Sequence, residues 1–209
     1  KVNYQATGSG AGVRQFFANT LDFGASDKAV KDSHLKEGGR QLVQIPIVGG
    51  AIVPAYNKEG CDLKIKQKQL ADVYLGKITD WKDLGCSAGK ITPVFRSDGS
   101  GTTAGFTNSL SSFSPEWKKK VGTDKAVAWP VGIGNKGNAG VAGNIRTTPG
   151  SIGYVNQAFI GKEVKEAWIE NKAGNFVKAT AETSSAGLAQ IELDDKLRGA
   201  NGNPDGENS

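Results

Sequence analysis

The stretch "VFRSDGSGTTAGFTNSL" (residues 94–110) combines a cation, a carboxylate and several small hydroxyl residues. Val94 and Phe95 end a short apolar segment typical of a strand, and the residues from Ala104 to Leu110 have helical spacing. The glycines and hydroxyl residues between them therefore lie at the start of a helix. There the first backbone N–H groups lack intrahelical partners and the helix dipole is positive. A helix start of this kind binds anions.

Two further segments have a similar composition. "TGSGAGVRQF" places Gly8, Ser9 and Gly10 between a predicted strand and a predicted helix, and "LDFGASDKAV" places Ser26 and Asp27 in the same position. Taken singly, each segment is explained at least as well by helix capping, because Ser, Thr and Asp are preferred N-caps. Taken together with the first stretch, they predict convergence on one tetrahedral oxyanion.

The expected ligand groups are hydroxyls and backbone N–H groups around this anion. The residues that would supply them are Ser9, Gly10, Ser100, Gly101 and Thr102. Arg96 would add charge-assisted hydrogen bonds of about 1.5–3 kcal/mol each. Asp98, two residues further along the chain, would hold the guanidinium in place.

Other kinds of site find little support in the sequence. "PVGIGNKGNAGV" matches G-x-G-x-x-G at Gly132, Gly134 and Gly137, but no acidic residue follows about 20 positions later, so loop glycines explain it better than a dinucleotide. "GSGTT" lacks the lysine of a P-loop, and no G-x-S-x-G motif is present. The single histidine, His34, is expected on the surface, which leaves no serine triad and no histidine-based metal site. We therefore expect a protein without catalytic residues, cofactor or metal.

Composition limits the classes of protein further. The chain has 209 residues, 29 of them glycine, and a net charge of +5. The one solid run of charge, Lys118 to Lys120, is better explained as a solvated helix face than as a nucleic-acid footprint. No apolar run approaches the ~18 residues that a membrane span needs. The opening "KVNYQATG" has neither an initiator Met nor a signal peptide, so we expect a processed or trimmed polypeptide.

The two cysteines, Cys61 and Cys86, lie 25 positions apart, each beside a turn signal. This spacing fits no zinc pattern. A disulfide would indicate an oxidising compartment and would contribute roughly 3.5 kcal/mol by the chain-entropy model. Two free buried thiols remain the alternative.

Short apolar segments alternate with helical patterns along the chain, which predicts an α/β fold with largely parallel sheets. The predicted strands are 2–5, 21–25, 91–95 and 151–155, with a β-rich stretch at 42–56 and a further apolar segment at 126–131. The predicted helices are 12–18, 28–36, 67–74, 140–146 and the segment after residue 100.

Five segments carry a resemblance to a known family. They are "KVNYQATGSGAGVRQF", "LDFGASDKAV", "VFRSDGSGTTAGFT", "WPVGIGNKGNAGVAG" and "TPGSIGYV". In this order and nearly this wording they are similar to the periplasmic phosphate-binding proteins of Pst-type ABC transporters. The resemblance runs from residue 1 to about residue 155 and is only general from Gly161 onward.

The resemblance implies a two-lobed periplasmic-binding-protein-like fold that buries inorganic phosphate between its lobes and delivers it to a membrane permease. It places the phosphate contacts on Ser9, Asp27, Arg96, Ser100, Gly101 and Thr102. Asp98 takes the role of the residue paired with the arginine. It also implies a monomer in the periplasm or on a lipid anchor, with no nucleic-acid partner.

One departure from the family pattern concerns both ends. Family members begin with a further strand, a glycine-rich Thr-Phe turn that touches phosphate, and a helix, and they end with strands that return to the first lobe. Without these segments we expect an incomplete first lobe at residues 1–55 and a second lobe at 56–209. Two alternatives remain: a phosphatase-like or phosphoryl-transfer enzyme on a related fold, and a secreted phosphate-binding protein that acts as a protein ligand.

Overall fold

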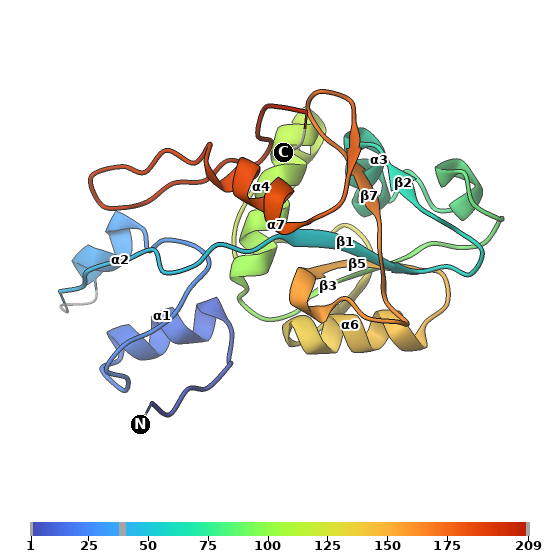
Figure 1. The fold of residues 1–209 in the computed structure, drawn as a ribbon. Helices are drawn as coiled ribbons and strands as arrows, with labels where there is room; N and C mark the ends of the chain where they lie inside the picture. Colours follow the sequence, from blue (N-terminus) through green and yellow to red (C-terminus); the bar gives the residue numbers. More distant parts are fainter. Residues whose placement is uncertain (1, 38–40, 208–209) are drawn as a thin grey trace.

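The structure is a computed structural model that describes residues 2–37 and 41–207 (Figure 1). Its α-helices are α1 (Ser9–Phe17), α2 (Asp32–Glu37), α3 (Gln67–Tyr74), α4 (Gly101–Phe113), α5 (Pro115–Lys120), α6 (Gly137–Thr147) and α7 (Ala181–Leu188). Its strands are β1 (Ile52–Asn57), β2 (Lys64–Ile65), β3 (Thr92–Arg96), β4 (Ile133–Asn135), β5 (Ser151–Asn156), β6 (Lys165–Glu166), β7 (Trp168–Glu170) and β8 (Phe176–Val177). Two 3₁₀ turns, η1 (Trp81–Leu84) and η2 (Gln157–Phe159), complete the set.

The main sheet has five strands in the order β4-β3-β5-β1-β6. β3 runs parallel to both β4 and β5, whereas β1 is antiparallel to β5 and β6. A small second sheet has the order β2-β7-β8, with one parallel and one antiparallel pair. The α/β prediction is confirmed, but the prediction of largely parallel sheets is wrong, because β1 reaches the sheet in the opposite direction to the strands that follow it.

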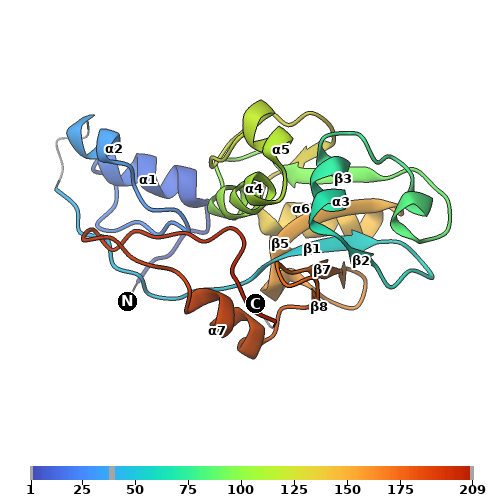
Figure 2. The ribbon, with the colours of Figure 1, turned by 90° about the horizontal axis from the view of Figure 1, so that it is seen from above.

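Both faces of the main sheet are covered by helices, with α6 on one face and α3 and α4 on the other (Figures 1 and 2). Alternation along β1 sends Val53 and Ala55 into the α6 side and Tyr56 into the opposite side. The larger cluster is aromatic, with Tyr74, Phe106, Trp117 and Tyr154 among its members. This core fixes the strand ends and helix starts on which the site is built.

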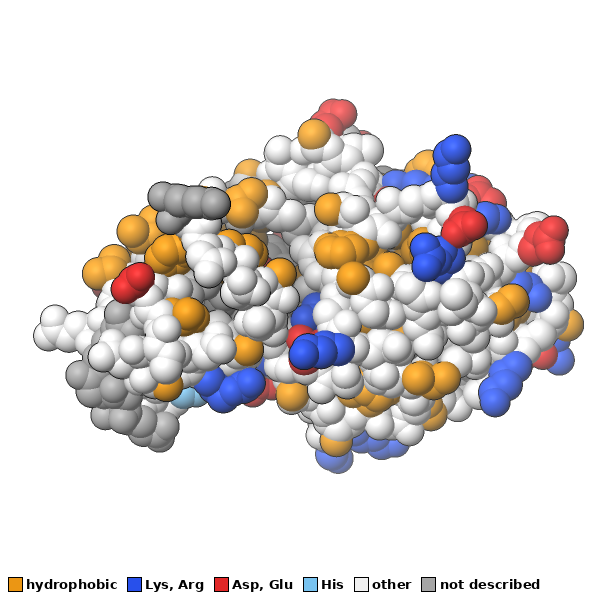
Figure 3. All heavy atoms as spheres, turned by 90° about the horizontal axis from the view of Figure 1, so that it is seen from below, with side chains coloured by type: hydrophobic (Ala, Val, Ile, Leu, Met, Phe, Trp, Pro, Cys, Tyr) orange, Lys and Arg blue, Asp and Glu red, His pale blue; other side chains and the backbone are white. Residues whose placement is uncertain are grey.

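The first fifty residues contribute little to the core. Among the described residues, Val30 is the one buried hydrophobic residue before β1. Large hydrophobic side chains are instead exposed there: Val2, Tyr4, Phe23, Val43, Ile45, Ile47 and Val48. Figure 3 shows hydrophobic side chains on the surface at this end of the molecule. The strands predicted at 2–5 and 21–25 are wrong, because no described strand pairs with them and an unpaired strand is unstable. Of the β-rich stretch predicted at 42–56, only the part from Ile52 onward forms a strand, β1.

Two further element predictions are corrected. The helix predicted at 28–36 begins at Asp32, so Asp27 and Ser26 do not lie at a helix start. The apolar segment 126–131 precedes β4 rather than forming a strand itself. His34, expected on the surface, is half-buried, with its ring centroid 6.3 Å from that of Phe17.

Two sets of ion pairs join the first forty residues to the rest of the chain. Lys28 and Lys31 bind Asp124 at 3.1 and 3.2 Å. Lys196 and Arg198 each place a nitrogen 2.8 Å from Asp32, and both ribbon views show this late segment beside α2. The lobe boundary expected at residue 55 falls inside β1, and the division into lobes stays a prediction.

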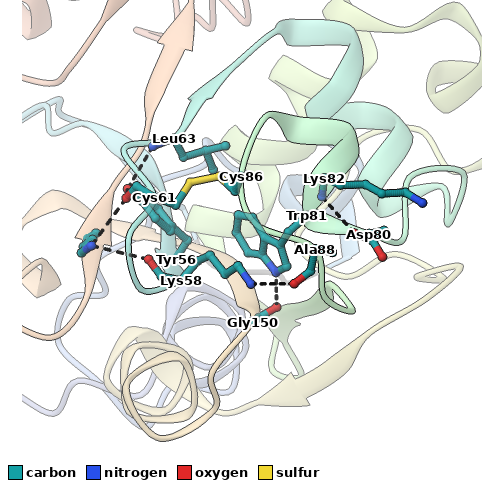
Figure 4. Close-up of a disulfide and its surroundings, with 11 residues drawn as sticks. Tyr56, Lys58, Cys61, Leu63, Asp80, Trp81, Lys82, Cys86, Ala88 and Gly150 are labelled. Carbon is teal, nitrogen blue, oxygen red and sulfur yellow. Dashed lines mark hydrogen bonds between the residues drawn. A yellow bond between two sulfur atoms is a disulfide. The ribbon is translucent and has the colours of Figure 1, made fainter.

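The disulfide is present between Cys61 and Cys86, whose Cα atoms are 5.5 Å apart (Figure 4). The hydroxyl of Tyr56 donates to the Cys61 carbonyl at 2.9 Å and accepts from the Leu63 N–H at 3.1 Å. The Trp81 indole donates to the Gly150 carbonyl at 3.0 Å. The bridge thus fastens the loop after β1 to η1 beside buried aromatic rings, and the free-thiol alternative is excluded.

The surface features expected from the sequence are found as well. Lys118, Lys119 and Lys120 are exposed on α5, where Lys120 pairs with Glu116 at 2.8 Å. Within residues 2–37 and 41–207, none of the helices combines the length and the apolar character that a membrane span needs.

Candidate anion-binding site

A cleft of about 910 Å³ lies between the first thirty residues and the helix starts of the main sheet. Its walls include nearly the whole set of residues expected from the sequence: Ser9, Asp27, Arg96, Asp98, Ser100, Gly101 and Thr102. Segments up to 157 positions apart in the chain therefore meet at one place, since Phe159 and Val2 line the same cleft.

The start of α4 forms one wall of the cleft. Ser100 is fully buried and caps the helix, with its hydroxyl oxygen accepting from the Thr103 N–H at 3.1 Å. The Ser100 hydroxyl hydrogen is not consumed by this bond and is available to a ligand. The N–H groups of Gly101 and Thr102, in the first turn, have no intrahelical acceptor. This wall combines hydrogen-bond donors with the positive end of a helix dipole.

Arg96 ends β3, directly before this wall, and its side chain is only 4% exposed. Asp98 binds it through two bonds, Nε to Oδ1 at 2.7 Å and Nη2 to Oδ2 at 2.5 Å. The same Oδ1 accepts from the Gly137 N–H at 3.0 Å, at the start of α6. Burial alone would raise the pKa of the Asp98 carboxyl, but the bonds from Arg96 and Gly137 outweigh it and lower the pKa below its ordinary value.

This geometry agrees with the role expected for Asp98. A bidentate bond fixes the plane of the guanidinium, and the other donors of Arg96 remain for an anion. Burying a guanidinium without a compensating charge costs folding free energy. The Asp98 carboxylate supplies that charge and so offsets the cost of burying Arg96.

The start of α1 forms the opposite wall. Gly8 precedes it with φ of 87°, a left-handed conformation that favours glycine, and an added Cβ would lie 2.7 Å from Asp98 Oδ2. The Ser9 hydroxyl oxygen accepts from the Asp27 N–H at 3.2 Å and keeps its own hydrogen for a ligand. The N–H of Gly10 donates to the Gly99 carbonyl at 2.7 Å, and Gly10 does not line the cleft. Gly10 therefore joins the two walls, and its expected role as an anion donor finds no support.

Asp27 lies against Gly101, although not as a helix cap. An added Cβ on Gly101 would be 2.5 Å from both Asp27 Cβ and Ser9 Oγ, and 2.9 Å from Asp27 Oδ2. The carboxylate is therefore next to the first turn of α4 while its residue remains exposed. It is the one acceptor among the expected contacts.

Thr102 differs from the other hydroxyl residues. Its hydroxyl donates to Asn156 Oδ1 at 2.9 Å, so that hydrogen is engaged within the protein. Asn138 Nδ2 also donates to Asn156 Oδ1, at 2.8 Å, and the Asn156 N–H donates back to Asn138 Oδ1 at 3.3 Å. The N–H of Thr102, rather than its hydroxyl, is the group that this arrangement leaves for an anion.

Sequence reasoning missed Asn138, Asn156 and Tyr154. Asn156 follows the quoted "SIGYV" directly, at the end of a strand parallel to β3. The ends of parallel strands lie at the same edge of a sheet, where ligands bind in α/β proteins. That rule would have singled out Asn156, whereas the position of Asn138 depends on α6 and has no comparable signal.

Cations gather beside the α4 wall. Burial and repulsion from Lys28 lower the pKa of the Lys125 ammonium below its usual value, and Arg14 and Lys31 add to the effect. Burial would raise the pKa of the Asp124 carboxyl, but the Lys125 N–H and the two neighbouring lysines lower it to about 2. These residues do not line the cleft, but their excess of positive charge beside its wall favours the approach of anions.

No metal centre emerges from the described residues, since His, Cys, Asp and Glu side chains nowhere form a group of three suited to a metal ion.

We expect Gly101→Ala to weaken binding of inorganic phosphate by at least about tenfold, because the new methyl would push the two walls apart. Titration calorimetry would measure it. Gly143→Ala in α6 is the matched control, since its methyl would meet no atom within 4 Å. Removing that helix glycine should stabilise the protein by about 0.5–1 kcal/mol and leave binding unchanged. Equal affinities in the two variants would mean that the walls do not close on the anion.

Comparison with known proteins supports the same fold. Residues 1–205 match the family model described as a PBP superfamily domain. The phosphate-binding protein PstS of Haemophilus influenzae is 45% identical over 211 residues, covering 94% of this chain and 62% of that protein. PstS of Xylella fastidiosa is 42% identical over 205 residues, covering 92% and 56%. The chain thus spans about 60% of the length of these relatives.

Among solved structures, the chain resembles a putative phosphate ABC transporter substrate-binding protein from Clostridium perfringens with bound phosphate. The TM-score is 0.70 at 24% sequence identity, over 88% of this chain and 68% of that one. This likeness confirms the predicted α/β fold class of periplasmic binding proteins, and part of the neighbour has no counterpart in this chain. The chain belongs to the PBP superfamily.

Proposed function

We propose that this chain binds inorganic phosphate in the cleft between the starts of α1 and α4, as part of the substrate-binding protein of an ABC-type phosphate importer. The observation that carries the proposal is the buried Arg96 guanidinium, which Asp98 holds beside the start of α4. There the N–H groups of Gly101 and Thr102 have no intrahelical acceptor. A buried cation beside free N–H and O–H donors suits a small, fully hydrogen-bonded anion. The relatives called phosphate-binding protein PstS support the same ligand.

The contacts we propose are the Arg96 guanidinium, the hydroxyls of Ser9 and Ser100, and the N–H groups of Gly101 and Thr102. Asp27 would accept a hydrogen bond from a protonated phosphate oxygen. These groups surround a tetrahedral anion with donors on most sides and one acceptor, which matches a phosphate that retains a proton.

The rest of the proposal concerns the biological setting. A binding protein of this kind would act in the periplasm or on a lipid anchor and hand phosphate to a membrane permease. The disulfide agrees with an oxidising compartment. The proposal also includes a monomeric state and no nucleic-acid partner.

Calorimetric titration of the purified 209-residue chain with inorganic phosphate tests the proposal. We expect saturable binding with one phosphate per chain, and no comparable heat with chloride at the same ionic strength. Absence of saturable binding would contradict the proposal.

The same sample distinguishes the enzymatic alternative. A binding protein needs donors around its ligand and no activated nucleophile, so a chromogenic phosphate monoester should release product no faster than in buffer. Sustained release that disappears in Ser100→Ala would favour the phosphatase-like reading.

A further inference from the structure

The hydroxyl of Tyr154 lies between the two elements that supply the donors of the site. Its oxygen accepts from the Arg96 N–H at 3.1 Å and lies 2.6 Å from Thr103 Oγ1. Arg96 is the last residue of β3, and Thr103 is in the first turn of α4. A single oxygen on β5 therefore holds both ends of the loop 97–100, which carries Asp98 and Ser100.

The Tyr154 ring has little freedom to move. It is fully buried and stacks on Phe106 of α4, with centroids 4.2 Å apart and planes 10° from parallel. Trp129 stacks at 5.8 Å. Burial raises the pKa of the Tyr154 hydroxyl to about 12, so the group is protonated at neutral pH and offers one donor and its lone pairs.

The loop between these two anchors has few other direct ties to the sheet. Its backbone N–H groups bind the Asn135 carbonyl, from Ser97 at 3.1 Å, and the Lys125 carbonyl, from Ser100 at 2.9 Å. Its other bonds run from the Gly10 N–H to the Gly99 carbonyl, and from Asp98 to the neighbouring Arg96 and to Gly137. None of these bonds joins β3 to α4, whereas the Tyr154 hydroxyl contacts both. The spacing between the guanidinium and the α4 donors therefore depends on it.

We propose that Tyr154 is the positioning residue of the site: its hydroxyl sets the spacing between Arg96 and the start of α4, and with it the affinity for phosphate. This inference rests on the proposed function. Tyr154 is not expected to touch the anion. It acts through the Arg96 backbone and the Thr103 side chain, so small displacements at these two points move the donors out of register with a tetrahedral ligand.

Tyr154→Phe removes the oxygen and keeps the ring. We expect phosphate affinity to fall by about tenfold, as for a displacement of donors by a fraction of an ångström. Tyr74→Phe is the matched control. The Tyr74 hydroxyl is equally buried and donates to the Val94 carbonyl, also on β3, at 3.2 Å, and its ring contacts Phe106. Both variants lose one buried hydroxyl, so chemical denaturation should show similar losses of stability, while only Tyr154→Phe should bind phosphate more weakly.

A second readout is independent of phosphate. Without its acceptor, the Arg96 backbone N–H should exchange with solvent deuterium at least about tenfold faster in Tyr154→Phe and at the wild-type rate in Tyr74→Phe. If the wild-type chain binds no phosphate, the proposed function fails, and the exchange rates still decide whether Tyr154 holds the end of β3.

Thr103→Val removes the side-chain hydroxyl that bonds to the Tyr154 hydroxyl. This variant tests the same inference if Tyr154→Phe does not fold. It should weaken phosphate binding in the same direction. Equal phosphate affinities in the Tyr154, Thr103 and Tyr74 variants, or an unchanged exchange rate of the Arg96 N–H in Tyr154→Phe, would overturn the inference.

Discussion

Arg96→Ala is expected to weaken phosphate binding by at least about a hundredfold, because removing one partner of a buried ion pair costs about 3–5 kcal/mol. The loss has two parts. The anion loses a charge-assisted donor, and Asp98, which is mostly buried, would turn an uncompensated carboxylate toward the ligand. The remaining Asp98 contact to Gly137 does not neutralise that charge. Titration calorimetry with phosphate measures the loss.

Controls separate these parts. Arg146→Ala also removes an arginine, but its side chain is 58% exposed and its ion-pair distance to Glu163 is 3.8 Å, so we expect wild-type binding. Arg96→Lys keeps the positive charge but loses the planar guanidinium that can form two parallel hydrogen bonds. Its phosphate affinity should lie between those of the wild type and Arg96→Ala. The double variant Arg96→Ala with Asp98→Ala should recover part of the affinity. Wild-type affinity in Arg96→Ala would show that the arginine has no part in binding.

The parts of the site that could be predicted from the sequence are those that local chemistry determines. Ser100 caps α4, and Arg96 and Asp98 pair, because both relations span only a few residues. The start of α1 was predicted less well: the pattern placed this helix at 12–18, whereas α1 begins at Ser9 after Gly8, which makes no side-chain cap bond. Asp27 shows the limit of such signals: it looked like a cap, yet α2 begins five residues later and Asp27 instead contacts the wall of another helix.

The fold was predicted where the core is complete. The strands β3 and β5 and the helix α3 agree with the sequence pattern, since buried partners on both faces of the sheet hold them. In the first fifty residues the pattern indicated strands that the structure lacks. Apolar composition gives a segment the capacity to form a strand, but the strand exists only when a neighbour pairs with its backbone, and the sequence does not show which neighbours are present.

The residues that were missed share one property. Asn156 holds the Thr102 hydroxyl and Tyr154 holds the Arg96 N–H, each across more than fifty positions of chain. Such contacts arise from the packing of β5 against β3 and α4 rather than from any spacing in the sequence. A sequence motif can therefore name the groups that face an anion, while the groups that set their spacing emerge only from the fold.

Asp27→Asn is expected to reduce the preference for phosphate over sulfate by about a hundredfold or more, out of an expected wild-type preference of ~10⁴-fold. The other proposed contacts donate hydrogen bonds and would accept either anion. An ionised carboxylate can only accept, and at neutral pH phosphate carries a proton to donate whereas sulfate carries none. Beside the first turn of α4, an unprotonated sulfate oxygen would face an unprotonated oxygen of the Asp27 carboxylate. No hydrogen bond could form between them, and the two negative charges would repel each other.

The structure removes the rival explanation of Asp27 as a helix cap, because α2 begins at Asp32. The substitution should therefore change stability by no more than about 0.5 kcal/mol, as at other exposed positions. Asp62→Asn is the matched control, an exposed aspartate that does not line the cleft, and should retain the wild-type preference. Competitive equilibrium dialysis of labelled phosphate against sulfate, on the wild type and both variants, measures the ratio directly. If the wild type already binds sulfate as well as phosphate, or if Asp27→Asn keeps the full preference, the discrimination does not come from this carboxylate.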